Sequence, residues 1–330
     1  MRDRKRFTII TPVYNDWESF AHLLREIEAT MPAPEYCIRV TAVDDCSIAK
    51  PAATGVSGSI EHVEVIRLAV NVGHQRAIAI GLVEKADSAD AGDFVAVMDA
   101  DGEDRPTELK QMIDLIYAQP ETALVAQRRR RSEGIGFKLF YFAYTCIFRL
   151  LTGRRISFGN FSVLNRQHLL QLVHNQNLWN NFAATLIHSK IPYTLVPTAR
   201  GRRYAGQSKM NFVALVTHGL GAISVFSDTV FVRILLASLT LFMLSLLGIL
   251  TVLGIRFLTD LAIPGWTTTV IGFATLVSLQ AIMMPVMIAF LQLSNRSSFQ
   301  SAPKAFASLQ IERIYTLYPT APDHLRAAAG

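Results

Sequence analysis

The sequence is short of cysteine, and the few cysteines present exclude two common ways of stabilising a small domain. Its 330 residues include three cysteines, Cys37, Cys46 and Cys146. Their odd number and scattered positions match neither a disulfide framework nor the spacing of zinc ligands, so a reducing, cytosolic environment is expected. No apolar segment separates the basic N-terminus from the first predicted strand, so no cleaved signal peptide is predicted either.

Charge is also too sparse for a typical nucleic-acid-binding protein. Charged residues make up 18% of the chain, and the formal net charge is +6. Much of the positive charge lies in two short runs, 128–131 and 200–209. No basic stripe interleaved with aromatic residues is present, so we expect no nucleic-acid partner. Phosphate ligands or an anionic membrane surface suit short basic runs better.

Apolar residues are in excess: they make up 51% of the chain and are concentrated after residue 229. Residues 234–255 and 263–293 carry no charge, and each stretch is longer than the ~20 residues that a helix needs to span a membrane. Residues 211–228 place apolar side chains in helical rhythm, which is typical of a helix lying at a membrane surface. The alternative for the two long stretches is a pair of core helices in a large soluble domain.

These patterns predict four segments. They are an α/β domain at 1–207, an interfacial amphipathic helix at 208–229, two transmembrane helices within 230–293, and a tail at 294–330 with too little pattern for an assignment. The connection between the spans contains Arg256 and Asp260. Basic residues flank the other side of the predicted membrane, namely Lys209, Arg233, Arg296 and Lys304. This bias places the α/β domain and both termini in the cytoplasm.

The first hundred residues alternate between strand and helix patterns, which predicts a doubly wound, mostly parallel sheet. The predicted strands are 7–13, 40–43, 62–68 and a run that starts at Phe94, with helices at 17–30 and 71–86. The last of these strands is a continuous apolar run, as expected for a strand buried on both faces.

Two carboxylates, Asp99 and Asp101, follow the Phe94 strand directly. Open α/β sheets bind ligands at the carboxyl ends of their strands, and an Asp-x-Asp turn there can bind Mg²⁺ or Mn²⁺, whose remaining ligands come from water and phosphate. Taken alone, the pair is more often only the end of a strand and the start of a turn. Polar residues at 14–16 and 44–45 end two further strands at the same edge, and this convergence favours a ligand with a base, a sugar and phosphates.

Five motifs, in order, resemble the glycosyltransferase family 2 enzymes of GT-A fold. They are Thr11–Asp16, Val43–Ser47, Asn71–Ala77, Met98–Glu103 and Arg200–Lys209, and together they cover residues 5 to 210. A C-terminal region with two apolar spans is similar to the subgroup that transfers sugars to polyprenyl phosphates, the dolichyl- or undecaprenyl-phosphate lipids. The resemblance implies a GT-A sheet followed by an interfacial helix and a two-helix transmembrane hairpin.

The resemblance also assigns residues to a nucleotide and a metal. Pro12, Tyr14 and Asp16 would line the nucleotide pocket, and Asp44 or Asp45 would accept hydrogen bonds from the base or ribose. The alternative makes Pro12 and Tyr14 turn and packing residues. The cation, Mg²⁺ or Mn²⁺, would be held by Asp99 and Asp101, with Glu103 either a further ligand or a solvated loop acid.

Phosphate binding is assigned to basic residues and to the start of the second helix. Asn71, Gly73 and Arg76 would face phosphate there, unless they only form a helix cap and a tight turn. The other candidates are Arg128, Arg200, Arg203, Ser208 and Lys209, for which solvated charge beside a membrane is the alternative. The proposed catalytic set is Asp99, Asp101, Asn160 and Arg203.

The sequence departs from the family at Ser157 and Asn160, where relatives commonly have aspartates, one of them often proposed as the base. A hydroxyl acceptor needs a base to remove its proton. A phosphate monoester does not, because its second pKa is about 6 and it is mostly anionic at neutral pH. The departure therefore favours a phosphate acceptor. The processive synthases' Gln-x-x-Arg-Trp motif has its nearest match at 176–179, without the arginine, which disfavours polymerisation.

The sequence thus predicts an inverting transferase that moves a hexose or related sugar from a UDP- or GDP-linked donor to polyprenyl phosphate. It would act at the cytoplasmic face of the cell membrane, anchored by two spans. The alternatives are transfer to another lipid or glycan hydroxyl, and a catalytically degenerate, membrane-anchored assembly partner. Assembly into a homo-oligomer is compatible with the sequence.

Overall fold

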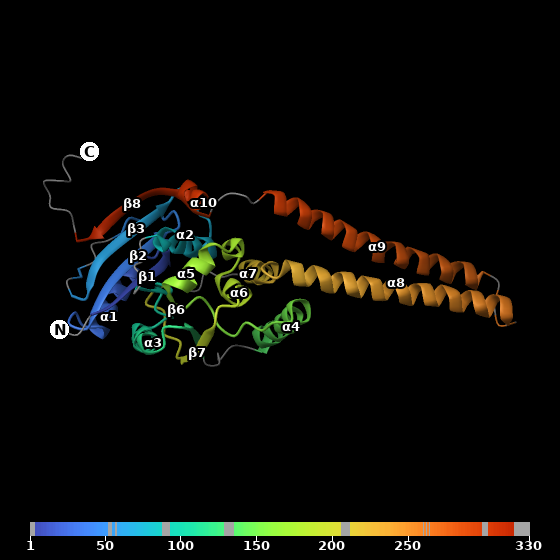
Figure 1. The fold of residues 1–330 in the computed structure, drawn as a ribbon, viewed down its shortest axis with the longest axis horizontal. Coiled ribbons are helices and arrows are strands. Elements are labelled where there is room, and N and C mark those ends of the chain that lie inside the picture. The colour runs from blue at the N-terminus through green and yellow to red at the C-terminus, as the bar shows by residue number, and fades with distance from the viewer. Residues whose placement is uncertain are drawn as a thin grey trace. The chain divides into compact units, whose positions relative to one another are not determined.

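The computed structural model describes residues 4–51, 55, 56, 58–87, 93–128, 135–205, 212–259, 261, 263, 265–298 and 303–319. The chain divides into two compact units. The first contains Met1–Tyr144, Arg155–Val225 and Ser301–Gly330, and the second contains Thr145–Arg154 and Phe226–Gln300. The first unit holds the sheet, and the second holds the two long C-terminal helices (Figure 1).

The first unit is built on one eight-stranded sheet with the order β7-β5-β6-β4-β1-β2-β3-β8. Its parallel core is β4 (Phe94–Val97), β1 (Lys5–Val13), β2 (Tyr36–Asp44) and β3 (Ile60–Leu68). On one side follow β6 (Ser162–Asn165), which is antiparallel to β4 and β5, then β5 (Ala123–Arg128) and β7 (Tyr193–Thr198), which are parallel to each other. The predicted doubly wound, mostly parallel sheet is confirmed.

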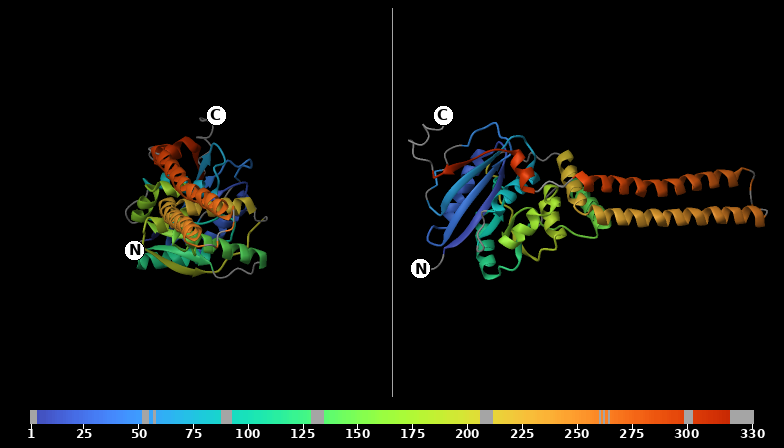
Figure 2. Two further views of the ribbon diagram at one scale, coloured as in Figure 1. Left: turned by 90° about the vertical axis from the view of Figure 1, so that its right-hand side faces the viewer. Right: turned by 45° about the horizontal axis from the view of Figure 1, so that its top comes forward.

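Helices cover both faces of this sheet (Figure 2). One face packs against α1 (Trp17–Thr30) and α3 (Pro106–Ala118), and the other against α2 (His74–Ala86), α5 (Arg166–Val173), the 3₁₀ turn η1 (Gln176–Trp179) and α6 (Phe182–His188). Neighbouring strand residues therefore point into different cores: Ile9 belongs to the first and Ile10 to the second, both fully buried. This is why β1 reads as a continuous apolar run.

Helix α2 lies unusually close to the sheet because of Gly81. A Cβ at this position would come within 2.7 Å of Ile10 Cγ2 and 2.8 Å of Val43 Cγ2. Those contacts are shorter than packed carbon atoms allow. The glycine thus sets the spacing between α2 and strands β1 and β2, and so fixes where the first turn of α2 lies relative to the strand ends.

The segment after the long helices returns to the sheet, which the sequence did not indicate. Helix α10 (Pro303–Gln310) is followed by β8 (Ile311–Tyr318), an edge strand antiparallel to β3. Figures 1 and 2 both show β8 beside β3. Most of the side chains of β8 are at least partly exposed, so an edge strand of this kind needs no regular apolar alternation. The predicted tail at 294–330 thus contains an element of the first unit.

The second unit contains two helices long and apolar enough to cross a membrane, α8 (Ser227–Leu258) and α9 (Trp266–Ser298). Their most apolar windows are 0% and 11% buried, so they are not core helices of the unit that contains them. They run side by side (Figure 1). Ser278 Oγ donates to Ser245 Oγ over 3.0 Å, and Ser245 Oγ donates to Ala274 O over 2.7 Å, polar contacts of the kind that join membrane helices.

Two further helices fall where helical patterns were predicted. The first is α4 (Ile135–Thr152), whose apolar and aromatic residues recur at helical spacing. The segment predicted as an interfacial helix contains α7 (Phe212–Ser224), which belongs to the first unit. A Cβ on Gly219 would meet the ring of Tyr144 at 2.7 Å, so this glycine allows α7 to pack closely against the end of α4 that belongs to the first unit.

Candidate active site

The loops that follow β1 and β2 are joined by reciprocal hydrogen bonds. Asn15, with φ +50°, donates its backbone N–H to Ser47 Oγ (2.8 Å), and its Oδ1 accepts the N–H of Ile48 (2.8 Å). Pro12 lies within β1, Tyr14 is 44% exposed, and Asp16 directly precedes α1. The three predicted nucleotide residues of this loop are therefore neighbours at the carboxyl edge of the sheet. Asn15, which was not predicted, sets the geometry of their loop.

Asp44 and Asp45 are both buried, and their carboxylates have different partners. Asp44 Oδ1 accepts the N–H of Ser47 (2.9 Å), and Oδ2 forms an ion pair with Arg67 Nη1 (2.8 Å). Asp45 accepts two backbone N–H groups, those of Val72 (2.7 Å) and Gly73 (3.0 Å). Burial raises the pKa of Asp45, and these backbone hydrogen bonds oppose the rise. Asp45 thus holds the segment that leads into α2, whereas Asp44 is paired with the guanidinium group of Arg67.

The start of α2 places the next set of predicted residues. Gly73 has φ +88°, a conformation that glycine adopts without strain, and α2 begins directly after it. Asn71 Nδ2 donates to the carbonyl of Asp45 over 3.3 Å. Arg76 is exposed on the first turn of α2. Asn71 and Gly73 therefore contribute to the turn that was their alternative role, and Arg76 remains available to a ligand.

The turn after β4 is closed by its own acids. The N–H of Asp99 donates to Asp104 Oδ2 (3.0 Å), and the N–H of Glu103 donates to Asp101 Oδ1 (2.9 Å). Gly102 has φ +87° at the tip. Burial raises the pKa of Asp101, and the neighbouring charge of Asp99 raises it further. The acids are thus concentrated in a small buried turn, at the carboxyl edge of the sheet as predicted.

A basic segment, Arg200–Tyr204, lies on this turn. The N–H of Gly201 donates to Glu103 O (2.9 Å), and the N–H of Tyr204 donates to Asp101 O (3.0 Å). Both glycines at this contact are required, because a Cβ on Gly201 would come within 2.0 Å of Gly102 O. The backbones of two segments that are far apart in the sequence therefore meet directly at the acid turn.

Side-chain ion pairs join the same two segments. Arg203 Nη2 lies 2.7 Å from Asp101 Oδ2, and Arg203 Nε lies 3.0 Å from Glu103 Oε1. Arg200 forms a close ion pair with the same Glu103 oxygen. Burial would raise the pKa of Glu103, but the two guanidinium groups outweigh it and lower the pKa. Glu103 is therefore neither a solvated acid nor open to solvent: it is buried between two arginines.

A series of polar contacts leads from α6 towards Asp99 and includes a residue that was not predicted, His74. The N–H of Phe182 donates to Gln75 Oε1 (2.8 Å), and Gln75 Nε2 donates to Asn160 Oδ1 (3.1 Å). Asn160 Nδ2 lies 2.9 Å from His74 Nε2, which lies 3.3 Å from Asp99 Oδ1. Partial desolvation would lower the pKa of His74, whose side chain is 46% exposed, but nearby carboxylates, with Asp99 the strongest, raise it. His74 lies inside the motif 71–77, which was the signal available for it.

The residues present fit a divalent cation only in part. Among the described residues, no three His, Cys, Asp or Glu side chains are grouped as a ready-made metal site. Asp99 and Asp101 offer the carboxylate oxygens that hard cations prefer. One Asp101 oxygen is on Arg203, and Glu103 is held by two arginines, so a cation would replace an arginine at Asp101. Ser208, Lys209, the run 129–131 and the side chain of Arg128 lie outside the described residues.

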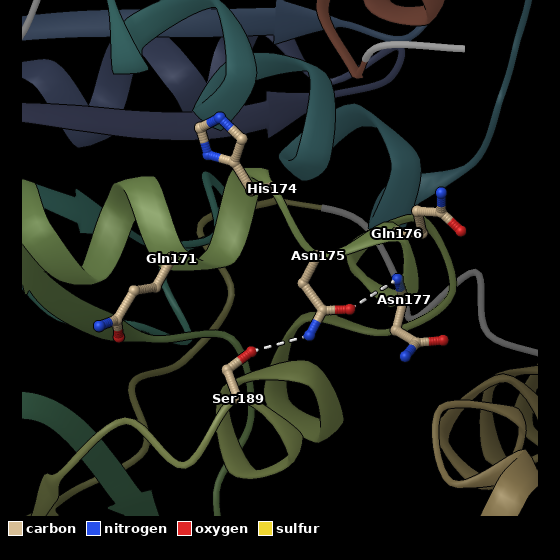
Figure 3. Close-up of a pocket in the computed structure, with 6 residues that line it drawn as sticks. All are labelled: Gln171, His174, Asn175, Gln176, Asn177 and Ser189. Carbon is tan, nitrogen blue, oxygen red and sulfur yellow. Dashed lines mark hydrogen bonds between the residues drawn. The ribbon is translucent and has the colours of Figure 1, made fainter. Parts of the chain in front are cut away.

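A separate hollow lies on the α5–η1–α6 side of the first unit (Figure 3). It measures about 620 Å³ and is lined by Gln171, His174, Asn175, Gln176, Asn177 and Ser189, none of which belongs to the predicted site. The carboxamide of Asn175 accepts the N–H of Asn177 (3.0 Å) and donates to Ser189 Oγ (2.9 Å). This carboxamide therefore holds the wall of the hollow in place. The acids of the turn after β4, which lie elsewhere, remain the cluster with distinctive chemistry.

Comparison with known proteins agrees with this geometry. The sequence model of glycosyl transferase family 2 matches residues 8–172. Undecaprenyl-phosphate 4-deoxy-4-formamido-L-arabinose transferase of Erwinia tasmaniensis is 24% identical over 218 residues, 64% of this chain and 65% of the relative. The chain thus aligns with less than two thirds of that relative's length. The uncharacterized glycosyltransferase YkcC of Bacillus subtilis is 25% identical over 279 residues, 81% of this chain and 82% of the relative.

Among solved structures, glucosyl-3-phosphoglycerate synthase from Mycobacterium tuberculosis, in complex with Mn²⁺, UDP-glucose and phosphoglyceric acid, aligns with 68% of this chain and 80% of its own. The TM-score is 0.49 at 12% identity. The family match covers half of the chain and contains the strand ends, the acid turn and the Gly73 turn described above. The chain belongs to glycosyl transferase family 2 and is a glycosyltransferase.

Proposed function

We propose that this enzyme transfers a hexose or related sugar, with inversion, from a nucleoside-diphosphate sugar to polyprenyl phosphate at the cytoplasmic face of a membrane. The observation that carries the proposal is the state of Asn160. Its amide is fixed between Gln75 and His74 beside Asp99, and this neutral group would stand where relatives commonly have the aspartate proposed as the base for a hydroxyl acceptor.

A phosphate acceptor removes that need. One oxygen of the phosphate monoester attacks the anomeric carbon, while the bond from that carbon to the diphosphate breaks and its electron pair leaves with the nucleoside diphosphate. No proton has to be removed, because a monoester with a second pKa of about 6 is mostly dianionic at neutral pH. Attack opposite the leaving group inverts the anomeric centre. Relatives named undecaprenyl-phosphate sugar transferases support this acceptor class.

The acids after β4 would serve the leaving group. Asp99 and Asp101 would hold Mg²⁺ or Mn²⁺, which when bound neutralises negative charge on the departing diphosphate. Glu103, buried between Arg200 and Arg203, would position these arginines rather than bind the cation. The arginines offer planar donors that suit diphosphate oxygens, and Arg203 would shift from Asp101 to phosphate as the cation takes its place.

The nucleotide would lie over the ends of β1 and β2. Pro12 is near the end of β1, Tyr14 and Asp16 lie between β1 and α1, and Asp44 is the last residue of β2. Asp44 and Asp45 would act by holding these loops, because both oxygens of each already have partners within the protein. Phosphate contacts are proposed for Arg76, Arg128, Ser208 and Lys209, besides Arg200 and Arg203. The two apolar helices support a membrane enzyme with two spans.

The first experiment is thermal unfolding of the full-length enzyme in detergent with UDP- and GDP-sugars, with and without Mn²⁺. We expect one nucleotide class to raise Tm in a metal-dependent manner. The same donor, radiolabelled and mixed with undecaprenyl phosphate and Mn²⁺, should give a labelled lipid. Nucleotide protection without any transfer would instead support a degenerate assembly partner. Transfer only to hydroxyl acceptors, with a rate that rises with pH, would contradict the phosphate acceptor.

A further inference from the structure

The C-terminal segment α10–β8 (residues 303–318) packs against the elements that build the nucleotide side of the site. Ala307 is fully buried, and the ring of Phe306 lies 4.9 Å from that of Trp179. Where α10 passes into β8, the carbonyl of Gln310 accepts the N–H of Ala69 over 2.8 Å. Ala69 directly follows β3 and also accepts a hydrogen bond from Cys46 Sγ at 3.6 Å. The segment therefore contacts the loops at the carboxyl edge itself.

Arg67, near the end of β3, joins this segment to Asp44. Its Nη1 lies 2.8 Å from Asp44 Oδ2, and its Nε lies 2.9 Å from Glu312 Oε2 on β8. The Asp44 side chain is 0% exposed, that of Arg67 is 21% exposed and that of Glu312 is 47% exposed. The guanidinium group thus spans from the surface of the edge strand to the buried carboxylate.

The two contacts of Arg67 differ in what they do. A buried carboxylate without a counter-charge is strongly disfavoured, so Arg67 supplies the positive charge that Asp44 needs beside it. The guanidinium is planar with donors in a fixed fork, so a hydrogen bond to Nε fixes the direction of the Nη1 donor. Glu312 contributes little stability of its own, because half-exposed ion pairs are screened by water. Its effect is to orient Arg67.

We propose that the C-terminal segment completes the nucleotide pocket, with Glu312 orienting Arg67 and Arg67 holding the buried Asp44 carboxylate. The other oxygen of Asp44 accepts the N–H of Ser47, whose hydroxyl accepts the N–H of Asn15 in the loop after β1. Arg67 and Glu312 are positioning residues, since both act through Asp44. The inference rests on the proposed function, in which the nucleotide lies over the ends of β1 and β2. It makes donor affinity depend on a strand that follows both apolar helices in sequence.

The test is nucleotide affinity of the full-length enzyme in detergent, measured by calorimetry with UDP and GDP in the presence of Mn²⁺. Arg67→Ala should weaken binding about tenfold or more, as expected when a hydrogen bond to a charged group is lost. Arg67→Lys keeps the charge but not the fork, and should recover part of the affinity. Glu312→Gln should weaken binding by about two- to fivefold, with Tm nearly unchanged.

The double variant separates an indirect role from a merely additive one. If Glu312 acts only through Arg67, Arg67→Ala combined with Glu312→Gln binds nucleotide no more weakly than Arg67→Ala alone. In the transfer assay, Glu312→Gln should raise KM for the donor and leave kcat nearly unchanged. Arg4→Ala and Glu61→Gln provide matched controls, because this pair joins the opposite end of β3 at 2.5 Å with similar exposure.

The outcomes distinguish two failures. Wild-type enzyme that binds neither UDP nor GDP overturns the proposed function, and the inference with it. Wild-type binding that Glu312→Gln leaves unchanged, or fully additive losses in the double variant, overturns the inference alone. An equal loss of affinity in the Arg4 and Glu61 controls also overturns it, because the effect would then be one of general sheet stability.

Discussion

The two ends of the parallel strands both carry networks of charged side chains, but the networks differ in how they are balanced. At the amino ends, Asp114 accepts from Lys5 Nζ (2.5 Å), from Tyr36 Oη (2.7 Å) and from Lys110 Nζ (3.0 Å). Here one acid is surrounded by donors. At the carboxyl ends, where acids cluster in the two turns after β2 and β4, the described residues that pair with them include Arg67, Arg200 and Arg203, and His74 lies beside Asp99.

The difference shows in the direction of the pKa shifts. Burial would raise the pKa of Asp114, but Lys5, Tyr36 and Lys110 lower it. At the carboxyl ends burial raises the pKa values of Asp45 and Asp101, whereas Arg200 and Arg203 lower that of Glu103. A balanced network stabilises the fold, whereas an excess of buried acid has a cost that an external cation can relieve. Charge density alone therefore does not mark a site; its imbalance does.

The contrast between the two ends of the strands is tested most strongly by removing one acid from each end. Asp101→Asn should lower kcat at least about a hundredfold, because the metal's stabilisation of the leaving group is worth several kcal/mol. Its Tm should stay the same or rise, since the ionised carboxylate is disfavoured by burial. Asp114→Asn should do the opposite, lowering Tm and leaving kcat intact. Transfer rates and Tm of both variants provide the check, and equal kcat losses would refute the contrast.

The next largest effect is expected at Asp45, the acid that holds backbone groups. Asp45→Ala leaves the N–H groups of Val72 and Gly73 without their acceptor, which costs about 1–3 kcal/mol of unfolding free energy. Asp45→Asn retains one acceptor oxygen and should recover part of this. Chemical denaturation measures the loss. A variant as stable as wild type would place Asp45 among ligand-binding acids instead.

The Glu103→Gln variant tests whether the ion pairs of Glu103 hold the basic segment over the acid turn. Gln cannot form the ion pairs with Arg200 and Arg203, so the segment 199–205 should open more often. Amide hydrogen exchange at Gly201 and Tyr204 should accelerate about tenfold, the change expected when a charged hydrogen bond is lost. The amides of β1 serve as an internal control. Exchange that does not change would mean that the contacts of the Gly102 and Gly201 backbones alone hold the segment.

The smallest effect concerns pH and the amino end. The pKa of Asp114 is lowered from its ordinary 3.8. Its contribution to stability is therefore present above the unfolded-state pKa and is lost as pH falls through the lower folded-state value. The side chain is 37% exposed, so the contribution is at most about 1 kcal/mol. The Tm difference between wild type and Asp114→Asn should shrink as pH falls from about 5 to about 3. A constant difference would exclude this contribution of Asp114 to stability.

Much of the carboxyl end could be predicted from sequence because strand ends converge by topology. Asp44, Asp45, Asp99 and Asp101 were placed at one edge by their position after apolar runs. Their partners could not be read, since side-chain direction depends on long-range packing. The helix predicted from residue 71 begins at His74 because Asp45 holds Val72 and Gly73 in a turn.

The fold shows the same division. Strand β2 was predicted at 40–43 and extends over Tyr36–Asp44, because it pairs with β1 along its whole length. Strand β8 was missed, as its pairing with β3 joins residues far apart in sequence and its side chains are largely exposed. Arg67 and Glu312 stand 245 positions apart. No local sequence pattern predicts a contact between residues so far apart, so the ion pairs of Arg67 with Glu312 and Asp44 could be found only from the structure.

That separation has a consequence for how the enzyme is made. During synthesis the N-terminal strands leave the ribosome first, and domains begin to fold as they emerge. Strand β8 emerges only after both long apolar helices have been translated. The sheet therefore cannot gain its last strand until α8 and α9 have been synthesised. A chain that is stalled or cleaved before residue 303 therefore carries the acid turn but lacks the edge strand β8.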